Sequence, residues 1–218
     1  MIEIHEVFPT YYGLLETLAE DNELTFDDGL YSQYLYLKNN PEVCQKSTVF
    51  VSSNIIREKY EDPIEGVVLC DMAHALAYNL LPNKRAYMSL DEIQELKSLG
   101  VKIGYHGANH WYLPKGLRPS EAMKIIREEV IESTRFNEEY HIFDNIFCTP
   151  YNQDRFTHFY VSLYEKRLGL EKYSMKFMEN RTPVENYVQG GGLLYDRWMF
   201  KRFPKGVSGI TGLFEGLM

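Results

Sequence analysis

The chain has 218 residues and a net charge of −8 at pH 7, with a sequence pI near 5.3. This acidity argues against nonspecific binding to nucleic acid or to an anionic membrane, and no apolar run approaches the roughly 18 residues that span a bilayer. Because 44% of the residues are hydrophobic, the chain can bury a sizeable core, and we expect one folded domain over residues 1–218.

Short apolar runs alternate with helical periods along the chain. The apolar and β-branched runs predict strands at 24–26, 47–51, 66–70, 101–105, 145–148 and 193–200. A capping box of Ser89 and Glu92 predicts a helix that ends before Gly100, and further helices are expected from Pro119 and around 156–163. Strands that alternate with helices indicate an α/β protein with a parallel sheet or barrel, whose ligands gather at the carboxyl ends of the strands.

Three polar clusters follow predicted strands: Asp27 with Asp28, His106 with His110, and the pair 150–151. Taken alone, two adjacent aspartates before a glycine more often form a turn, and two histidines spaced by four are more often structural or incidental. Their shared place at strand ends favours a common site instead.

Two histidines and a carboxylate suit a metal site. If the segment 106–110 turns helically, its two imidazoles lie on one face about 5–6 Å apart, within reach of one ion. Such a donor set leaves positions open for water and substrate. The metal lowers the pKa of bound water toward about 7, and a neighbouring free carboxylate can take its proton. The aspartate pair is then explained as one residue for the metal and one for the proton.

These motifs make the chain resemble the polysaccharide deacetylase superfamily, the NodB homology domain of carbohydrate esterases. The first family motif, TFDDG, stands unchanged at 25–29. The second, H-[ST]-x-x-H, is matched by HGANH at 106–110, where Gly107 replaces the hydroxyl residue. The third, R-x-P-Y, corresponds to 148–151 with Cys148 in place of the arginine. The resemblance implies a distorted (β/α) barrel with fewer than eight strands.

The resemblance also implies a role for each matching residue. It makes Asp27 the general base, and Asp28, His106 and His110 the ligands of one divalent metal. Zinc is the default, and mixed oxygen and nitrogen ligation also admits cobalt, manganese or iron. The backbone N–H of Tyr151 would help hold the oxyanion formed when water attacks an acetamide or formamide carbonyl. The implied activity is removal of an N-acetyl or N-formyl group from a sugar or polysaccharide precursor.

The chain departs from the family in two places. The family's arginine normally pairs with the catalytic aspartate. Here Arg197 or Arg202 could supply that positive charge instead. The alternative is that these arginines lie on the exposed charged face of a late strand. The last motif, which ends in L-x-H-D and supplies the histidine that protonates the departing amine, is absent. Asp27 is the leading replacement for that acid, and His158 is the less favoured candidate.

Aromatic and isolated polar residues complete the expectations. Trp111 follows a proposed ligand directly and is expected to stack on a sugar ring, with Pro150 and Arg197 as further substrate contacts. The histidines that lie in no motif are expected to serve structure: His5, His74 and His141.

The compartment follows from the N-terminus and the cysteines. The segment 1–13 lacks the basic start and apolar stretch of a secretory signal. The three cysteines fit reduced thiols rather than a disulfide framework or a zinc knuckle. We therefore expect a cytoplasmic protein that acts on a soluble N-acylated sugar or sugar-linked precursor; the oligomeric state stays open.

Two other interpretations stay open at this level. The missing arginine and the missing final histidine are compatible with a degenerate relative that binds carbohydrate or metal without turnover. An unrelated α/β protein with coincidental motifs is the weaker alternative. The presence of all three metal ligands together with the base favours the enzyme.

Overall fold

The computed structural model describes residues 1–5, 7, 12–56, 87–112, 114, 116–152, 176–178 and 181–184. The chain divides into two compact units, Met1–Thr182 and Pro183–Met218, and only Pro183 and Val184 of the second are described. The expected single domain stays a prediction. The strands expected at 66–70 and 193–200, and the helix expected around 156–163, lie outside the described residues.

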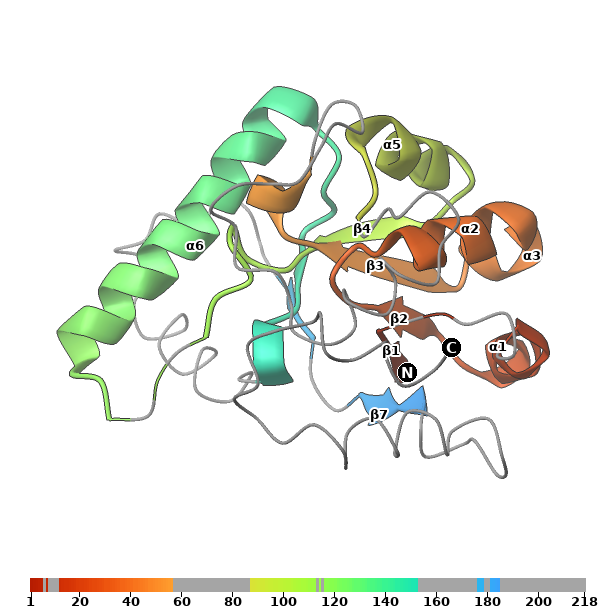
Figure 1. The fold of residues 1–218 in the computed structure, drawn as a ribbon, viewed down its shortest axis with the longest axis horizontal. Helices are drawn as coiled ribbons and strands as arrows, with labels where there is room; N and C mark the ends of the chain where they lie inside the picture. The colour runs from red at the N-terminus through yellow and green to blue at the C-terminus, as the bar shows by residue number, and fades with distance from the viewer. Residues whose placement is uncertain are drawn as a thin grey trace, which may run out of the picture. The chain divides into compact units, whose positions relative to one another are not determined.

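A parallel sheet forms the centre of the first unit (Figure 1). Six strands pair in parallel in the order β6-β5-β4-β3-β2-β1, and β7 follows β1. Their bounds are β1 Ile2–Ile4, β2 Leu24–Phe26, β3 Ser47–Val51, β4 Lys102–Tyr105, β5 Ile146–Phe147, β6 Lys176–Phe177 and β7 Thr182–Pro183. The α/β class with a parallel sheet is therefore confirmed, and closure of the sheet into a barrel stays a prediction.

Four of these strands lie where the sequence pattern places them. β2 and β3 coincide with the predicted ranges, and β4 and β5 fall within theirs. Every residue of β2 and β3 is buried, as expected for central strands of a parallel sheet. β1, β6 and β7 were not predicted. β2, which has as few residues as β1, was found with the help of the aspartate pair that follows it.

Helices flank this sheet. The described ones are α1 Tyr12–Asp21, α2 Tyr31–Asn39, α3 Pro41–Cys44, α5 Leu90–Ser98 and α6 Pro119–Tyr140, with short 3₁₀ turns η2 Ser53–Ile55 and η3 Pro150–Asn152. α5 begins at the predicted capping box: the Ser89 hydroxyl accepts from the Glu92 N–H, and the Glu92 carboxylate accepts from the Ser89 N–H. α2 and α5 lie side by side (Figure 1), where the Tyr34 hydroxyl donates to Glu95 over 2.7 Å.

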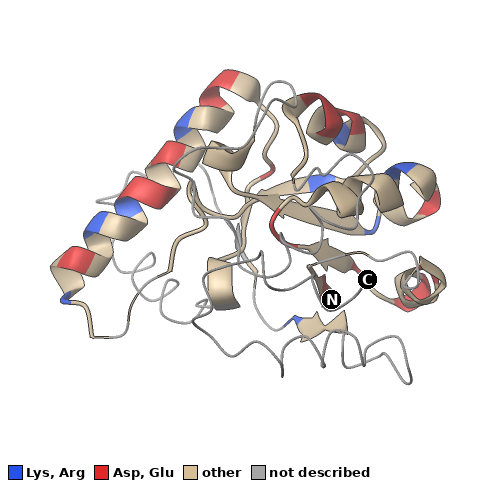
Figure 2. Ribbon diagram, in the orientation of Figure 1, with Lys and Arg blue, Asp and Glu red and all other residues tan. Residues whose placement is uncertain are grey.

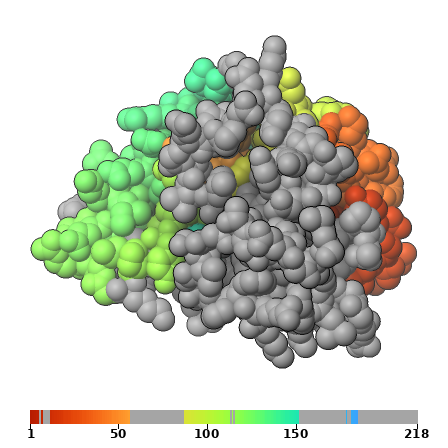
Figure 3. All heavy atoms as spheres, in the orientation of Figure 1, coloured from red at the N-terminus to blue at the C-terminus, as the bar shows by residue number. Residues whose placement is uncertain are grey.

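Charged side chains gather on the helices, above all along α6 and α5 (Figure 2). The space-filling view shows α6 and the α2–α3 segment on opposite sides of the described surface (Figure 3). Within the residues that the structure describes, no helix combines the length and the apolar character needed to cross a membrane. Cys44 and Cys148 are buried and form no disulfide bond among the described residues.

Candidate active site

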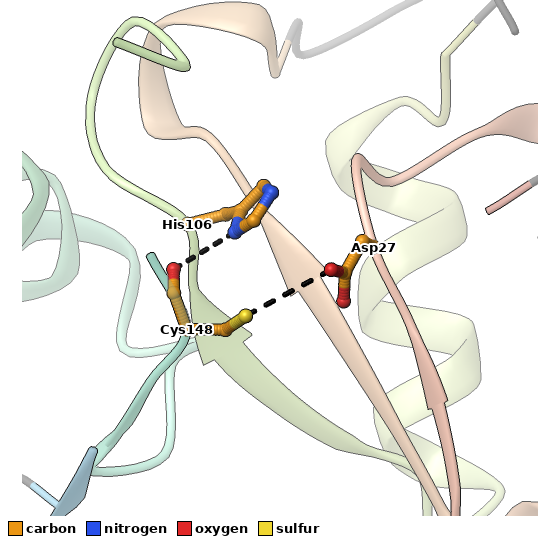
Figure 4. A group of neighbouring side chains, drawn as sticks. All are labelled: Asp27, His106 and Cys148. Carbon is orange, nitrogen blue, oxygen red and sulfur yellow. Dashed lines mark hydrogen bonds between the residues drawn. The ribbon is translucent and has the colours of Figure 1, made fainter. Parts of the chain in front are cut away.

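The three polar clusters meet at the carboxyl edge of the parallel sheet. Asp27 and Asp28 follow β2, and His106 opens the loop after β4. The pair 150–151 begins the η3 turn after β5, and Cys148 lies directly behind β5. Figure 4 shows the side chains of Asp27, His106 and Cys148 turned toward one another from these three elements. Parallel strands present their carboxyl ends at one edge of a sheet, so segments far apart in the sequence converge there.

Asp28, His106 and His110 form the first part of the site, which we call the metal group. Asp28 Oδ1 lies 3.3 Å from His106 Nε2 and 2.9 Å from His110 Nε2. All three side chains are buried, and one donor atom from each lies within 4.8 Å of the others. Among the described residues, Asp28 Oδ1 makes no hydrogen bond of acceptable geometry. A buried carboxylate oxygen that faces two imidazole nitrogens in this way suits a shared cation.

The hydrogen bond of His106 sharpens this point. Its Nδ1 lies 2.8 Å from the carbonyl oxygen of Cys148, and because a carbonyl only accepts, Nδ1 carries the hydrogen. Nε2 of a neutral ring then presents a lone pair to Asp28 Oδ1. Burial opposes a charged ring, but the carboxylates of Asp28 and Asp27 raise the pKa of His106. The arrangement calls for positive charge between the ring and the carboxylate, and a divalent metal with a His₂Asp donor set fits it.

The loop that carries both histidines is not the helical turn that the sequence argument considered. Residues 106–110 have no helical structure, yet the two imidazole rings lie with their centroids 5.0 Å apart. Gly107 has φ of 79° and His110 has φ of 53°, both in the left-handed region. These two residues bend the chain so that the rings meet without a helix.

Glu129 of α6 holds this loop in place. One oxygen of its buried carboxylate accepts the backbone N–H groups of Ala108 and Asn109, each over 2.8 Å, and the other accepts the Asn109 side-chain amide over 2.8 Å. A Cβ at position 107 would lie 2.8 Å from Glu129 Oε2 and 2.9 Å from Trp111 Cδ1. The loop therefore approaches Glu129 too closely for any residue but glycine, where the resembled family has a hydroxyl residue.

Asp27 belongs to a second part of the site, the acid–base group, which consists of Glu3, His5, Asp27 and Arg181. Arg181 Nη1 donates to Asp27 Oδ1 over 2.5 Å, and Nη2 lies 3.6 Å from Glu3 Oε1. The Arg181 side chain is only 2% exposed. Burial of Asp27 favours its neutral form, but the Arg181 guanidinium outweighs this and holds the pKa of Asp27 below its usual value. The contact with Arg181 therefore favours the ionised form of Asp27.

Arg181 is a residue that the sequence argument missed. Arg197 and Arg202, which were expected to return the missing charge, lie outside the described residues. Arg181 immediately precedes β7 and is 154 positions from Asp27 along the chain. No motif surrounds it, so no local signal marks it. Cys148, which occupies the family's arginine position, instead places its thiol 3.8 Å from Asp27 Oδ2 (Figure 4).

His5 is the most exposed member of the acid–base group. It follows β1, and its Nε2 lies 3.8 Å from Glu3 Oε1 and 3.9 Å from Asp27 Oδ2. Its side chain is 45% exposed, whereas those of Glu3, Asp27 and Arg181 are buried. The group therefore connects a buried carboxylate with a solvent-facing imidazole.

Aromatic side chains border the metal group. The Tyr151 ring meets the His110 ring edge-on at 4.8 Å between centroids, and Tyr112 meets Tyr151 at 5.4 Å. Tyr112 is 52% exposed and Tyr151 43%, whereas Trp111 is 7% exposed. Pro150 opens the η3 turn. The substrate contacts of Trp111 and Pro150 and the oxyanion role of the Tyr151 N–H stay predictions, and the exposed aromatic surface next to His110 belongs to the two tyrosines.

A scan against protein-family models gives no match to this chain, and a search of curated proteins gives none either. Among solved structures, the chain is similar to a Streptococcus pyogenes deacetylase, PplD, in complex with acetate. The likeness has 14% sequence identity and a TM-score of 0.44, and it covers 84% of this chain and 74% of that chain. At these values the likeness decides neither fold nor function, and the functional proposal rests on the side chains of the site.

Proposed function

We propose that this chain is a metal-dependent hydrolase that removes an N-acetyl or N-formyl group from a sugar or a sugar-linked precursor, as a divergent member of the polysaccharide deacetylase superfamily. The observation that carries the proposal is the convergence of Asp28, His106 and His110 beside a separately held carboxylate, Asp27. Ligands and base are thereby distinct residues, as hydrolysis with an activated water requires.

In the proposed reaction, Asp28 and the two histidines hold one divalent metal, with zinc as the default and cobalt, manganese or iron as alternatives. The metal, when bound, would lower the pKa of water toward about 7 and polarise the scissile carbonyl. Asp27 takes the proton of the attacking water, and Arg181 keeps Asp27 in its basic form. The backbone N–H of Tyr151 donates to the oxyanion that develops on the substrate.

A carbohydrate substrate is supported by the aromatic rim. Tyr112 and Tyr151 are exposed large hydrophobic residues, and Tyr151 touches the ring of His110. An exposed aromatic face beside a polar reaction centre suits a pyranose ring, which presents apolar C–H groups on one side and hydroxyl groups at its edge. Trp111, Pro150 and Arg197 are proposed as further substrate contacts.

The alternative function is carbohydrate or metal binding without turnover. The replacement of the family's arginine by Cys148 favours it, because an unpaired buried aspartate would be a poor base. The contact between Arg181 and Asp27 removes that argument, since the guanidinium is present at 2.5 Å although it comes from another segment. We therefore favour the enzyme.

The experiment that tests the proposal combines metal analysis with a release assay. Purified protein is expected to hold one equivalent of divalent metal, and His106→Ala and His110→Ala are expected to lose it. His141→Gln, at the exposed end of α6, is the matched control that keeps the metal. The metal-loaded wild type is then screened for acetate and formate release from N-acylated sugars, their oligomers and nucleotide-linked forms.

Two outcomes contradict the proposal. Undiminished metal content in both histidine variants would show that the metal group is not the metal site, and the proposed hydrolase mechanism would then be wrong. A full complement of metal with no acyl release from any N-acyl sugar supports the binding protein instead.

A further inference from the structure

We propose that His5 is the general acid that protonates the departing amine, an assignment that rests on the proposed hydrolase. Hydrolysis of an amide expels an amine, which is a poor leaving group unless its nitrogen receives a proton as the C–N bond breaks. Asp27 was the replacement first expected for this acid, since a carboxyl group that has taken the proton of water can return it to nitrogen. His5 offers a second route, in which the proton is already in place when the C–N bond breaks.

The position of His5 fits this role. It emerges at the carboxyl edge of the sheet directly after β1, next to the Asp27 loop, because Ile4 and Phe26 are register partners. Its Nε2 lies 3.9 Å from Asp27 Oδ2, a separation that one bridging water closes. With 45% of its side chain exposed, the imidazole can meet a substrate that enters from solvent.

The other histidines near the site are less suited. His106 and His110 are buried, and both face Asp28 as proposed metal ligands. His158, the less favoured candidate of the sequence argument, lies outside the described residues. His5, which was expected to serve structure because no motif surrounds it, is the histidine that combines contact with the base and access to solvent.

The proton transfers balance within this pair. Asp27 takes one proton from the attacking water, and the oxygen of that water forms the new bond to the acyl carbon. When the C–N bond breaks, its electron pair stays on nitrogen, which takes the proton of the His5 imidazolium. Asp27 then returns its proton to His5. The net change is one water consumed, one carboxylic acid and one amine formed, and both side chains restored.

The charges around His5 keep it in its acid form. The groups that face it are Glu3 from β1, Asp27 and Asp28 from the loop after β2, and Arg181 from the segment before β7. The partial burial of the ring and the charge of Arg181 oppose the imidazolium, but the three carboxylates outweigh them and raise the pKa of His5 above its ordinary value.

The test compares a substrate that needs the acid with one that does not. The amide is an N-acetylglucosamine oligomer, and the ester is 4-nitrophenyl acetate, whose phenolate leaves without a proton. In His5→Gln, the ratio of amide to ester kcat/KM is expected to fall about 100-fold, the scale of a lost general acid. Asp27→Asn is expected to lower both activities, because both reactions use the base, and His141→Gln is the control for histidine loss elsewhere.

A second measurement is independent of turnover. The titration of the His5 imidazole, followed by NMR in the metal-loaded protein, is expected to move to a lower pKa in Glu3→Gln, because the Glu3 carboxylate lies 3.8 Å from His5 Nε2. An unchanged amide-to-ester ratio in His5→Gln overturns the proposal, as does a His5 pKa that Glu3→Gln leaves unchanged. If wild type with bound metal hydrolyses neither substrate, the hydrolase itself is wrong and the acid assignment falls with it. Ester hydrolysis without amide hydrolysis by wild type contradicts His5 alone.

Discussion

The metal group and the acid–base group lie side by side at one edge of the sheet, but they are encoded in different ways. Asp28, His106 and His110 come from two short motifs, and each motif directly follows a strand. Glu3, His5, Asp27 and Arg181 come from three segments, and Arg181 is 154 positions from its partner. The proposed metal ligands can therefore be found from short sequence motifs. The charges around Asp27, by contrast, depend on which distant segments the sheet brings together.

The largest effect is expected where the two groups meet, at Asp27. Asp27→Asn removes the base but none of the three proposed ligands, so we expect the metal to stay bound and turnover to fall about 10²- to 10⁴-fold. Metal content and kcat/KM are measured on the same preparation. Asp28→Asn is the matched control, and it is expected to lose the metal. If the two variants behave in the opposite way, the roles of the two aspartates are exchanged.

Arg181→Met tests whether the acid–base group needs its distant cation. The change removes the arginine partner of the buried Glu3 and Asp27 carboxylates, and breaking a buried pair costs about 3–5 kcal/mol of the free energy of unfolding. The pKa of Asp27 rises, because burial is no longer opposed by the guanidinium. The acidic limb of the pH profile of kcat/KM is therefore expected to move to higher pH.

The stability loss in Arg181→Met also has a defined pH dependence. In the wild type, the pKa of Asp27 is below the ordinary 3.8, so its ionic contribution is full above that pH and is lost as the pH falls through the lower folded value. The difference in unfolding free energy between wild type and variant should therefore narrow in acid. Arg118→Met, at an exposed pair with Glu121, is the control that leaves stability nearly unchanged. A wild-type-like variant at neutral pH would show that Arg181 is dispensable.

What the sequence predicts well is local. Ser89 and Glu92 predict the start of α5 because the two residues satisfy each other's backbone groups within one turn. TFDDG and HGANH predict the two loops of the metal group for the same reason, since each needs only a strand end. β1 was missed because no recognisable motif follows it, whereas the equally short β2 is followed by the aspartate pair; in the structure β1 pairs with β2. Without β1 there was no reason to place His5 beside Asp27.

Glu129 shows the same limit inside the metal group. Its place on the helical stripe of α6 gave no sign that it accepts two N–H groups from a loop 20 positions earlier. Gly107 was read as a departure from the family motif, whereas the close approach of Glu129 and Trp111 requires it. The sequence thus indicated the proposed ligands but not the side chain that holds their loop.

Glu129→Gln tests that support. The oxygen that glutamine keeps can accept the two backbone N–H groups, but its NH2 group cannot accept from the Asn109 side chain, and the negative charge is lost. The loop is then held less firmly, and metal affinity is expected to fall about 10- to 100-fold, the usual effect of changing a residue that supports a metal ligand. The measurement is a competition titration against a chelator. Glu128→Gln, an exposed neighbour on α6, is the matched control. Equal affinities in the two variants would assign Glu129 to folding alone.

The smallest effect is expected at the rim, where neither group is touched. Tyr112→Ala removes an exposed ring that meets Tyr151, and lost stacking of about 0.5–1.5 kcal/mol corresponds to a KM increase of up to roughly tenfold with kcat retained. Tyr112→Phe keeps the ring and should keep the KM of wild type. An equal rise in KM in both variants would point to the hydroxyl as the contact.

Buried Trp111 is expected to behave differently. Its replacement by Ala is expected to lower the unfolding temperature, because its ring packs beside Gly107 under the loop that carries His106 and His110. A rise in KM confined to Trp111→Ala would support the sugar contact proposed for Trp111.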